Sequence, residues 1–372
     1  MGRAAVDSHW AGAKRILVSR LDNLGDVLLA TPAIHAIRET LPEAHITLHA
    51  SPAGAVVADL NPDLDDVVVY QAPWMDPEKT LPQDPRREQA MIERLRSGRY
   101  DGAIIFTSYH ESPLPTAYLY YLAGIPLRHA ASVDGPGSLL TSRHRHPDGL
   151  VHEVERGLDL VAGLGFRAEQ ADLVLRLRPG DREAVEARLE ALGIRRDRPL
   201  AVVHPGSTCP SRTYPWEQYA AAADLLVGEL GCQVVLTGGA GEVTLAEDVR
   251  RAMSWPSLSL AGRTTFAELA ALIAASDVVV TNNTGPMHVA AALKTPVVVL
   301  FALTNPPEQW GPWHAPHRLL YHSTECALCY TRRCPVDHAC LRKVTPRQVL
   351  LAAAELLQER RARRMNTDGL TG

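Results

Sequence analysis

The sequence predicts an α/β protein with two successive domains, each built on a parallel sheet. Three observations support this fold class. The chain has 372 residues, and one hydrophobic core rarely serves more than about 250–300 residues. In the first half, short apolar runs typical of buried parallel strands alternate with segments of helical spacing. The same alternation begins again near residue 200.

The first half opens with a strand, a glycine-containing turn and a helix. Residues 1–14 are expected to form a disordered extension. Arg15–Ser19 is a short apolar run that suits a buried strand, and Leu21–Asp26 is a polar turn. From Val27 to Leu41, apolar residues recur at a spacing that places them on one helix face.

The remaining elements of the first half continue this pattern. Residues 71–85, with four prolines, are expected to form a loop, and residues 128–150 a mobile loop rich in Gly, Pro, Arg and His. A helix is expected over 151–165, and another over 179–193 at the boundary with the second domain. Because the segments between strands have room for crossover helices, the sheet should be parallel. The further strands are expected at His45–Ala50, Asp65–Tyr70 and Gly102–Thr107.

The second half repeats the strand, glycine turn and helix. Gly231 is a natural helix stop, Thr264 or Thr265 a candidate N-cap, and Thr345 an N-cap followed by Pro346 at the first helical position. Strands are expected within Leu200–Ser207, Cys232–Gly239, Asp277–Leu293 and Thr295–Ala302. The predicted domains are 15–178 and 179–345, followed by a terminal helix and tail over 346–372.

The composition excludes several classes of function. The chain has 38 Lys and Arg against 42 Asp and Glu, a net charge of -4, which gives no general attraction for nucleic acid or anionic membranes. No apolar run reaches the roughly 18 residues of a membrane span, and the N-terminus lacks the apolar core of a secretion signal. We therefore expect a cytoplasmic protein, with at most peripheral contact at the inner face of a membrane.

Polar turns follow several predicted strands, where ligands bind in open α/β sheets. In the turn from Asn282 to His288, the free N–H groups at the start of a helix favour a phosphate or diphosphate, although Asn283 or Thr284 could equally cap the helix. In His204–Pro215, Arg212 could add a positive charge, or simply be an exposed side chain of a surface turn. The sequence contains no P-loop, and no G-x-G-x-x-G follows the first strand, so neither of these two nucleotide-binding motifs is present.

Two carboxylates occupy comparable turns. Glu242, after the glycine pair Gly238–Gly239, could hold ribose hydroxyls, or belong to a plain strand-to-helix loop. Asp26 follows Gly25 at the start of the first helix. A carboxylate at a strand end is well placed as a general base for a hydroxyl nucleophile, but the helix dipole alone also favours Asp there.

The cysteines leave two interpretations open. Four of the six lie close together in the sequence, and a reducing compartment argues against a disulfide framework. Only one C-x2-C pair occurs among them, so either a structural zinc site or free or redox-active thiols would fit. The four residues are Cys326, Cys329, Cys334 and Cys340.

Together these motifs resemble glycosyltransferase family 9, the ADP-heptose heptosyltransferases of lipopolysaccharide core assembly. The resemblance spans nearly the whole chain, and the order and spacing of its pieces are more specific than any single one. The matching segments are Arg15–Ile34, His204–Tyr219, Val234–Glu242, Leu260–Leu293 and Val344–Leu350.

The resemblance implies a GT-B fold, with two Rossmann-like domains whose parallel sheets face across a cleft. It implies Asp26 as the catalytic base and a donor diphosphate bound without metal or other cofactor. The family often has Lys in a K-x-W-P element where this chain has Arg212, and D-T-G where it has Asn283, which puts in doubt a role needing negative charge there. The donor residues implied are Ser207, Thr208, Arg212, Gly239, Glu242, Leu260, Asn283, Thr284, Gly285 and His288.

The predicted activity is inverting transfer of a sugar, heptose from ADP-heptose, to a glycan or glycolipid of the lipopolysaccharide-core type. Acceptor contacts are expected from Arg20, Asn23 and Arg143, which suit an acidic or phosphorylated acceptor. Two alternatives remain: another NDP-sugar used on a secondary metabolite or surface polymer, or a nucleotide-sugar-binding protein without catalysis.

Overall fold

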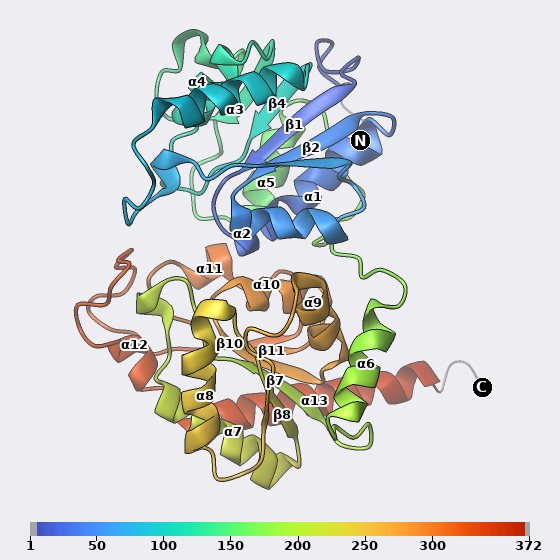
Figure 1. Cartoon of the computed structure of the whole chain (residues 1–372), viewed down its shortest axis with the longest axis vertical. Coiled ribbons are helices and arrows are strands. Elements are labelled where there is room, and N and C mark those ends of the chain that lie inside the picture. The colour runs from blue at the N-terminus through green and yellow to red at the C-terminus, as the bar shows by residue number, and fades with distance from the viewer. Residues whose placement is uncertain (1–5, 369–372) are drawn as a thin grey trace. The chain divides into compact units, whose positions relative to one another are not determined.

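The computed structural model describes residues 6–368 and divides into two compact units, Met1–Arg176 and Leu177–Gly372. Each unit is a six-stranded sheet whose neighbouring strands are all parallel. Figure 1 shows each sheet flanked by helices of its own unit. The predicted fold class, an α/β protein with two Rossmann-like domains, is confirmed.

The N-terminal sheet has the order β3-β2-β1-β4-β5-β6. Helix α1 packs against α5, and α3 against α4. The strands are β1 (Arg15–Arg20), β2 (His45–Ala50), β3 (Asp66–Val69), β4 (Gly102–Ile105), β5 (Leu127–Ala131) and β6 (Ser142–His144). The helices are α1 (Leu24–Thr40), α2 (Pro52–Ala55), α3 (Pro85–Ser97), α4 (Leu114–Leu122) and α5 (Glu153–Ala162).

The C-terminal sheet has the order β12-β11-β10-β7-β8-β9. Helix α7 packs against α8 and α13, and α6 against α9. The strands are β7 (Leu200–His204), β8 (Gln233–Leu236), β9 (Leu258–Ser259), β10 (Val278–Asn282), β11 (Val297–Leu300) and β12 (His317–Leu320). The helices are α6 (Asp181–Ala191), α7 (Trp216–Leu230), α8 (Val243–Ala252), α9 (Phe266–Ala275), α10 (Gly285–Ala292), α11 (Pro307–Trp310), α12 (Ala339–Arg342) and α13 (Pro346–Asp368).

The strand orders of the two sheets are the same when each is counted from its own first strand. In both, the order reverses between the first and fourth strands, β1 and β4 in one unit and β7 and β10 in the other. Open α/β sheets bind ligands beside the carboxyl ends of the strands at such a switch point. The topology therefore marks one candidate binding edge in each unit.

The expectation of a disordered extension over 1–14 is wrong for residues 6–14, while residues 1–5 lie outside the described part. Trp10 is only 2% exposed and packs edge-on against Phe166, with ring centroids 6.1 Å apart. Gly102 makes room for it, since a Cβ there would lie 2.6 Å from the indole. One buried tryptophan anchors this segment, and a single residue leaves no periodic signal in the sequence.

The mobile loop expected over 128–150 is also wrong, because the segment contains β6 and most of β5. Arg128 ties it together by donating from Nε to the carbonyl of Leu139 at 2.7 Å and from Nη2 to that of Ser138 at 2.9 Å. The two strands are only five and three residues long, too short for an alternating pattern to stand out.

No helix in the described part of the chain is both long and apolar enough to cross a membrane.

Candidate active site

Asp26 lies in the first turn of α1, directly after the carboxyl end of β1. Its Oδ2 accepts a hydrogen bond from the backbone N–H of Asn23, the N-cap residue, at 3.1 Å. The helix-capping role considered from the sequence is therefore real. The Asp26 carboxylate can still accept further hydrogen bonds, because each oxygen carries more than one lone pair and the side chain is 15% exposed.

Arg20, at the end of β1, organises the carboxylates around this turn. Its side chain is 5% exposed, with Nε donating to Asp22 at 2.7 Å and Nη2 to Ser108 Oγ at 2.7 Å. The same guanidinium lies 3.4 Å from Asp26 Oδ1 and 3.7 Å from Glu153 Oε2. Ser108 also donates to Asp22 Oδ2 at 3.0 Å, so residues after β1 and β4 form one network.

Burial and charge act against each other in this network. Burial by itself would lower the pKa of Arg20, but the carboxylates of Asp22 and Asp26 outweigh it and raise that pKa. Burial raises the pKa of Asp22 well above its usual value, and Asp26 adds repulsion that Arg20 only partly offsets. Arg20 therefore stays charged and holds Asp26 in place. Its single positive charge is outnumbered by the acidic side chains around it.

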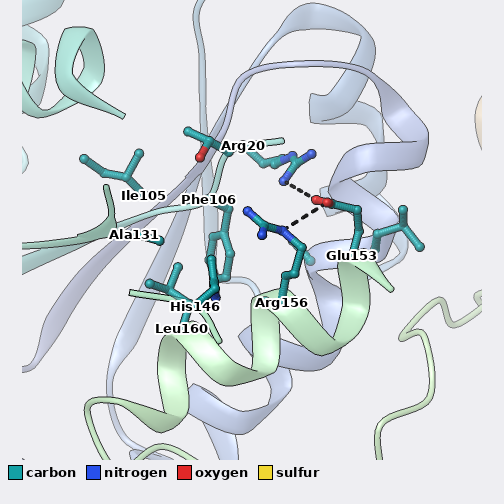
Figure 2. Close-up of a pocket in the computed structure, with 12 residues that line it drawn as sticks. Arg20, Ile105, Phe106, Ala131, His146, Glu153, Arg156 and Leu160 are labelled. Atoms are coloured by element: carbon teal, nitrogen blue, oxygen red, sulfur yellow. Dashed lines mark ion pairs between the residues drawn. The ribbon is translucent and has the colours of Figure 1, made fainter. Parts of the chain in front are cut away.

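A pocket with about 350 Å³ of empty space, partly open to solvent, adjoins this network. Figure 2 shows Arg20 of β1 and Arg156 of α5 both directed at Glu153, and Arg156 Nε lies 3.1 Å from Glu153 Oε1. A second hollow of about 270 Å³ lies on the side of Ser19, Trp74 and Glu111. Asp26 lines neither pocket, and contacts the first through Arg20.

The three residues predicted to contact the acceptor lie in two different places. Arg20 and Asn23 lie with Asp26 at the end of β1. Arg143 instead donates from Nε to the carbonyl of Ser132 at 2.7 Å and from Nη2 to that of Val133 at 2.6 Å, which fixes the loop between β5 and β6. Sequence reasoning missed other charged and hydroxyl residues of this site. These are Asp22, Ser108, Glu111, Glu153 and Arg156.

At the carboxyl edge of the C-terminal sheet, Asn282 joins the two strands of the switch point. From the end of β10, its Nδ2 donates to the carbonyls of Pro205 at 2.8 Å and Gly206 at 3.1 Å, in the turn after β7. Its Oδ1 accepts from the backbone N–H of Tyr214 at 3.0 Å. This fully buried amide fixes both ends of the predicted phosphate turn.

Glu242 lies directly over that turn. Its Oε2 accepts from the N–H of Gly239 at 2.7 Å and lies 3.5 Å from Nε2 of His204. Burial opposes ionisation, yet the imidazole of His204 and the N–H of Gly239 hold the pKa of Glu242 below its usual value. A Cβ at Gly206 would lie 2.1 Å from the carboxylate, so a larger residue there would require the Glu242 side chain to move. Glu242 therefore presents a carboxylate after the end of β8. Leu260, another predicted donor residue, is buried after the neighbouring strand β9.

Arg212 and Asn283 are linked through the loop after β11. Arg212 Nε donates to Thr304 Oγ1 at 3.1 Å, and Thr304 donates to Asn305 Oδ1 at 3.2 Å. Asn283 Nδ2 contacts the same Asn305 oxygen at 3.3 Å and donates to the carbonyl of Ala302 at 3.4 Å. Its Oδ1 accepts from the N–H of Ala302 at 3.1 Å. An amide can both donate and accept here, whereas a carboxylate cannot donate.

The remaining donor-side residues lie at the start of α10 and in the turn after β7. Helix α10 begins at Gly285, with Thr284 as N-cap and buried His288 in its first turn. Thr208 is exposed, and Ser207 Oγ accepts from the N–H of Cys209 at 3.2 Å. The structure thus brings the predicted donor residues to one edge of one sheet.

Three of the clustered cysteines are neighbours, since burial raises the pKa of Cys340 and the nearby Cys334 and Cys326 add to the rise. Cys326 and Cys329 contact the hydroxyls of Thr324 and Thr331, and Cys334 Sγ accepts from the N–H of His338 at 3.0 Å. All six cysteines are free thiols. Among residues 6–368, one group of three or more His, Cys, Asp or Glu side chains is placed to share a metal ion. That group lies in the N-terminal unit and includes none of the cysteines. The structure therefore gives no support to a zinc site among these cysteines.

Two doubly wound parallel domains in one chain, each with polar side chains at its switch point, define the GT-B fold. The model of glycosyltransferase family 9 (heptosyltransferase) matches residues 89–340, more than half of the chain. The chain therefore belongs to this family.

Relatives and solved structures agree with this assignment. Lipopolysaccharide heptosyltransferase 3 of Escherichia coli is 28% identical over 295 residues, covering 78% of this chain and 82% of that protein. A family 9 glycosyl transferase from Veillonella parvula has a TM-score of 0.78 at 23% identity, covering 96% and 100%. E. coli ADP-heptose lps heptosyltransferase II has a TM-score of 0.74 at 24% identity, covering 93% and 99%. At these identities the structural likeness shows the fold.

Proposed function

We propose that this family 9 enzyme transfers a heptose from ADP-heptose, with inversion, to a hydroxyl of a lipopolysaccharide-core or other cell-surface glycan. The observation that carries the proposal is the placement of Asp26. It is a partly exposed carboxylate at the carboxyl end of β1, held by the Asn23 N–H on one oxygen and facing Arg20 with the other. ADP-heptose and lipopolysaccharide are named for a similar solved enzyme, which supports this donor and acceptor.

Asp26 acts as the general base in this proposal. It accepts the proton of the acceptor hydroxyl while that oxygen attacks the anomeric carbon of the heptose. The bond from the anomeric carbon to the diphosphate breaks in the same step, and ADP leaves with the electron pair. One displacement inverts the anomeric centre, and no enzyme nucleophile is needed.

The C-terminal unit stabilises the leaving diphosphate. Arg212 provides a fixed positive charge, and the N–H of Gly285 at the start of α10 provides a donor with the helix dipole behind it. Ser207 and Thr208 add hydroxyls, and the Glu242 carboxylate accepts from the ribose hydroxyls. With these groups, transfer proceeds without a metal at the diphosphate.

The N-terminal unit holds the acceptor. The pocket beside Arg20 carries a second guanidinium, Arg156, so it suits an acceptor with phosphate or carboxylate groups near the reacting hydroxyl. Asn23 lies in the turn next to Asp26 and is placed to contact the same sugar.

Product analysis tests the proposal. The purified protein is incubated with ADP-heptose, and separately with UDP- and GDP-sugars, together with deacylated lipopolysaccharide-core acceptors. We expect ADP release matched by one heptose added per acceptor, without any metal ion added to the reaction. Faster transfer from another nucleotide sugar would contradict the donor assignment. Tight donor binding with no turnover on any acceptor would point to a binding protein.

A further inference from the structure

We propose that His144, His146 and Asp159 form a divalent transition-metal site, separate from the sugar-transfer residues, that ties the edge of the N-terminal sheet to α5. The three candidate ligand atoms all lie within 4.8 Å of one another. Neither the transfer mechanism nor the sequence motifs of the family resemblance uses Asp159.

The geometry is that of an open two-histidine, one-carboxylate site. Nε2 of His144 lies 2.6 Å, and Nδ1 of His146 2.8 Å, from the same oxygen, Oδ2 of Asp159. The two imidazole rings do not stack: their centroids are 4.9 Å apart and their planes lie at 72°, edge to face. Ligand atoms around a tetrahedral zinc with bonds of about 2.0–2.1 Å are roughly 3.3 Å apart. To admit an ion, the His146–Asp159 pair would separate by about 0.5 Å and the His144–Asp159 pair by about 0.7 Å.

The environment orients the three groups. His144 presses its Nδ1 side against the end of α5, since a Cβ on Gly163 would lie 2.9 Å from that nitrogen. Nε2 is therefore the nitrogen turned to Asp159. The neighbouring His129 does not take part, because its nitrogens contact Ser142 Oγ at 2.7 Å and the carbonyl of Leu160 at 3.1 Å. The side chain of Asp159 is 37% exposed, which leaves a route for an ion.

The chemistry of the three side chains also suits a metal. Two imidazoles and one carboxylate are the ligand set of zinc and of divalent iron or cobalt sites with open positions.

The position of the site gives the metal its role. His144 ends β6, a three-residue edge strand; His146 lies in the connection to α5; and Asp159 lies on α5 itself. An ion bound here would hold the connection between β6 and α5 against α5. It would also fix the position of His146, which forms part of the wall of the pocket in Figure 2. The site therefore stabilises the N-terminal unit, and it does not touch the diphosphate.

Metal titration of the whole protein tests the proposal. After removal of bound metal, we expect one equivalent of Zn²⁺ to bind and to raise the melting temperature. His146→Gln and Asp159→Asn should each weaken binding at least tenfold. Gly163→Ala should also weaken binding, since it crowds His144 without removing a ligand, at a φ that alanine tolerates. His9→Gln, an exposed histidine elsewhere, is the matched control and should bind as the parent does.

Cobalt distinguishes this site from the cysteines. Co²⁺ bound by the three proposed ligands should show visible bands without the intense near-ultraviolet band of thiolate ligation, and a Cys326→Ser, Cys329→Ser variant should bind equally. The proposal is overturned if His146→Gln and Asp159→Asn keep parent affinity, or if Zn²⁺ leaves the parent melting temperature unchanged. In the latter case hydrogen bonds alone hold the cluster together. Circular dichroism of the metal-free variants confirms that they are folded.

Discussion

The two sheets share a strand order but present different chemistry at their switch points. The N-terminal edge gathers ionisable groups, with Arg20 among the carboxyl groups of Asp22, Asp26 and Glu153. The C-terminal edge relies on neutral amides, Asn282 and Asn283, that bind backbone groups. Under the proposed function, the first edge supplies a carboxylate that accepts a proton, and the second supplies hydrogen-bond donors and Arg212 to the diphosphate, with the Glu242 carboxylate directed at the ribose.

Removing the base tests this division most directly. Asp26→Asn keeps a side-chain oxygen for the Asn23 N–H but cannot accept a proton from an alcohol. We expect turnover to fall about 10²- to 10⁴-fold, the usual contribution of general base catalysis, with donor affinity nearly unchanged. Steady-state kinetics and donor titration measure the two quantities.

Asp26→Ala is the matched comparison, since it removes the cap as well and should also cost about 1 kcal/mol of stability. If Asp26→Asn weakened donor binding as much as turnover, the assignment of catalysis to the N-terminal edge would fail.

Asn282→Ala tests the carboxyl edge of the C-terminal sheet, where neutral amides bind the backbone. It leaves the N–H of Tyr214 and the carbonyls of Pro205 and Gly206 without their partner, and unpaired buried groups cost about 1–3 kcal/mol each. Allowing for relaxation, we expect a loss of about 3 kcal/mol in the free energy of unfolding, measured by urea denaturation. The exposed Thr208→Ala should change stability little, and an equal loss there would show that the turn is not held by Asn282.

Acid should weaken the N-terminal unit through His129. Burial lowers the pKa of His129 from 6.5 to about 4, so below pH 6.5 the unfolded chain binds the proton more readily. The stability it contributes is complete above pH 6.5 and is lost as the pH falls toward 4. This amounts to about 2 kcal/mol between pH 7 and pH 5. His129→Gln should reduce the pH dependence of urea unfolding by that amount, and an unchanged slope would contradict a buried neutral histidine.

Arg212→Gln should give the smallest effect. Losing one charge-assisted contact to phosphate is expected to weaken donor binding about tenfold, with a smaller loss of turnover. Arg212→Lys should restore part of the affinity, since it keeps the charge but not the planar hydrogen-bonding group. Calorimetric titration with ADP provides the measurement, and unchanged affinity in the Gln variant would remove Arg212 from the donor site.

The sequence predicted local features well and distant ones poorly. β2 matches its predicted bounds, and the caps at Thr265, Gly231 and Thr345 occur as expected, because local turn chemistry decides them. The short strands β5, β6, β9 and β12 were not predicted, since two to five residues carry no clear period.

The same limit applies to the site. Asp26 and Glu242 stand next to glycines at strand ends, so a local pattern marks them. Ser108 and Glu153 reach Arg20 from 88 and 133 residues away, and only the folded sheet brings them there. Thr304 and Asn305 were missed for the same reason, as they follow a strand distant in sequence from Arg212.

The fit of Glu242 over Gly206 limits how the donor pocket can be redesigned. A side chain at position 206 would meet the Glu242 carboxylate, which would then have to leave its contacts with the N–H of Gly239 and with His204. Under the proposed function, a chimera that swaps the loop after β7 alone would thereby shift the carboxylate assigned to the ribose. A library for new nucleotide donors should therefore vary the loops after β7 and β8 together.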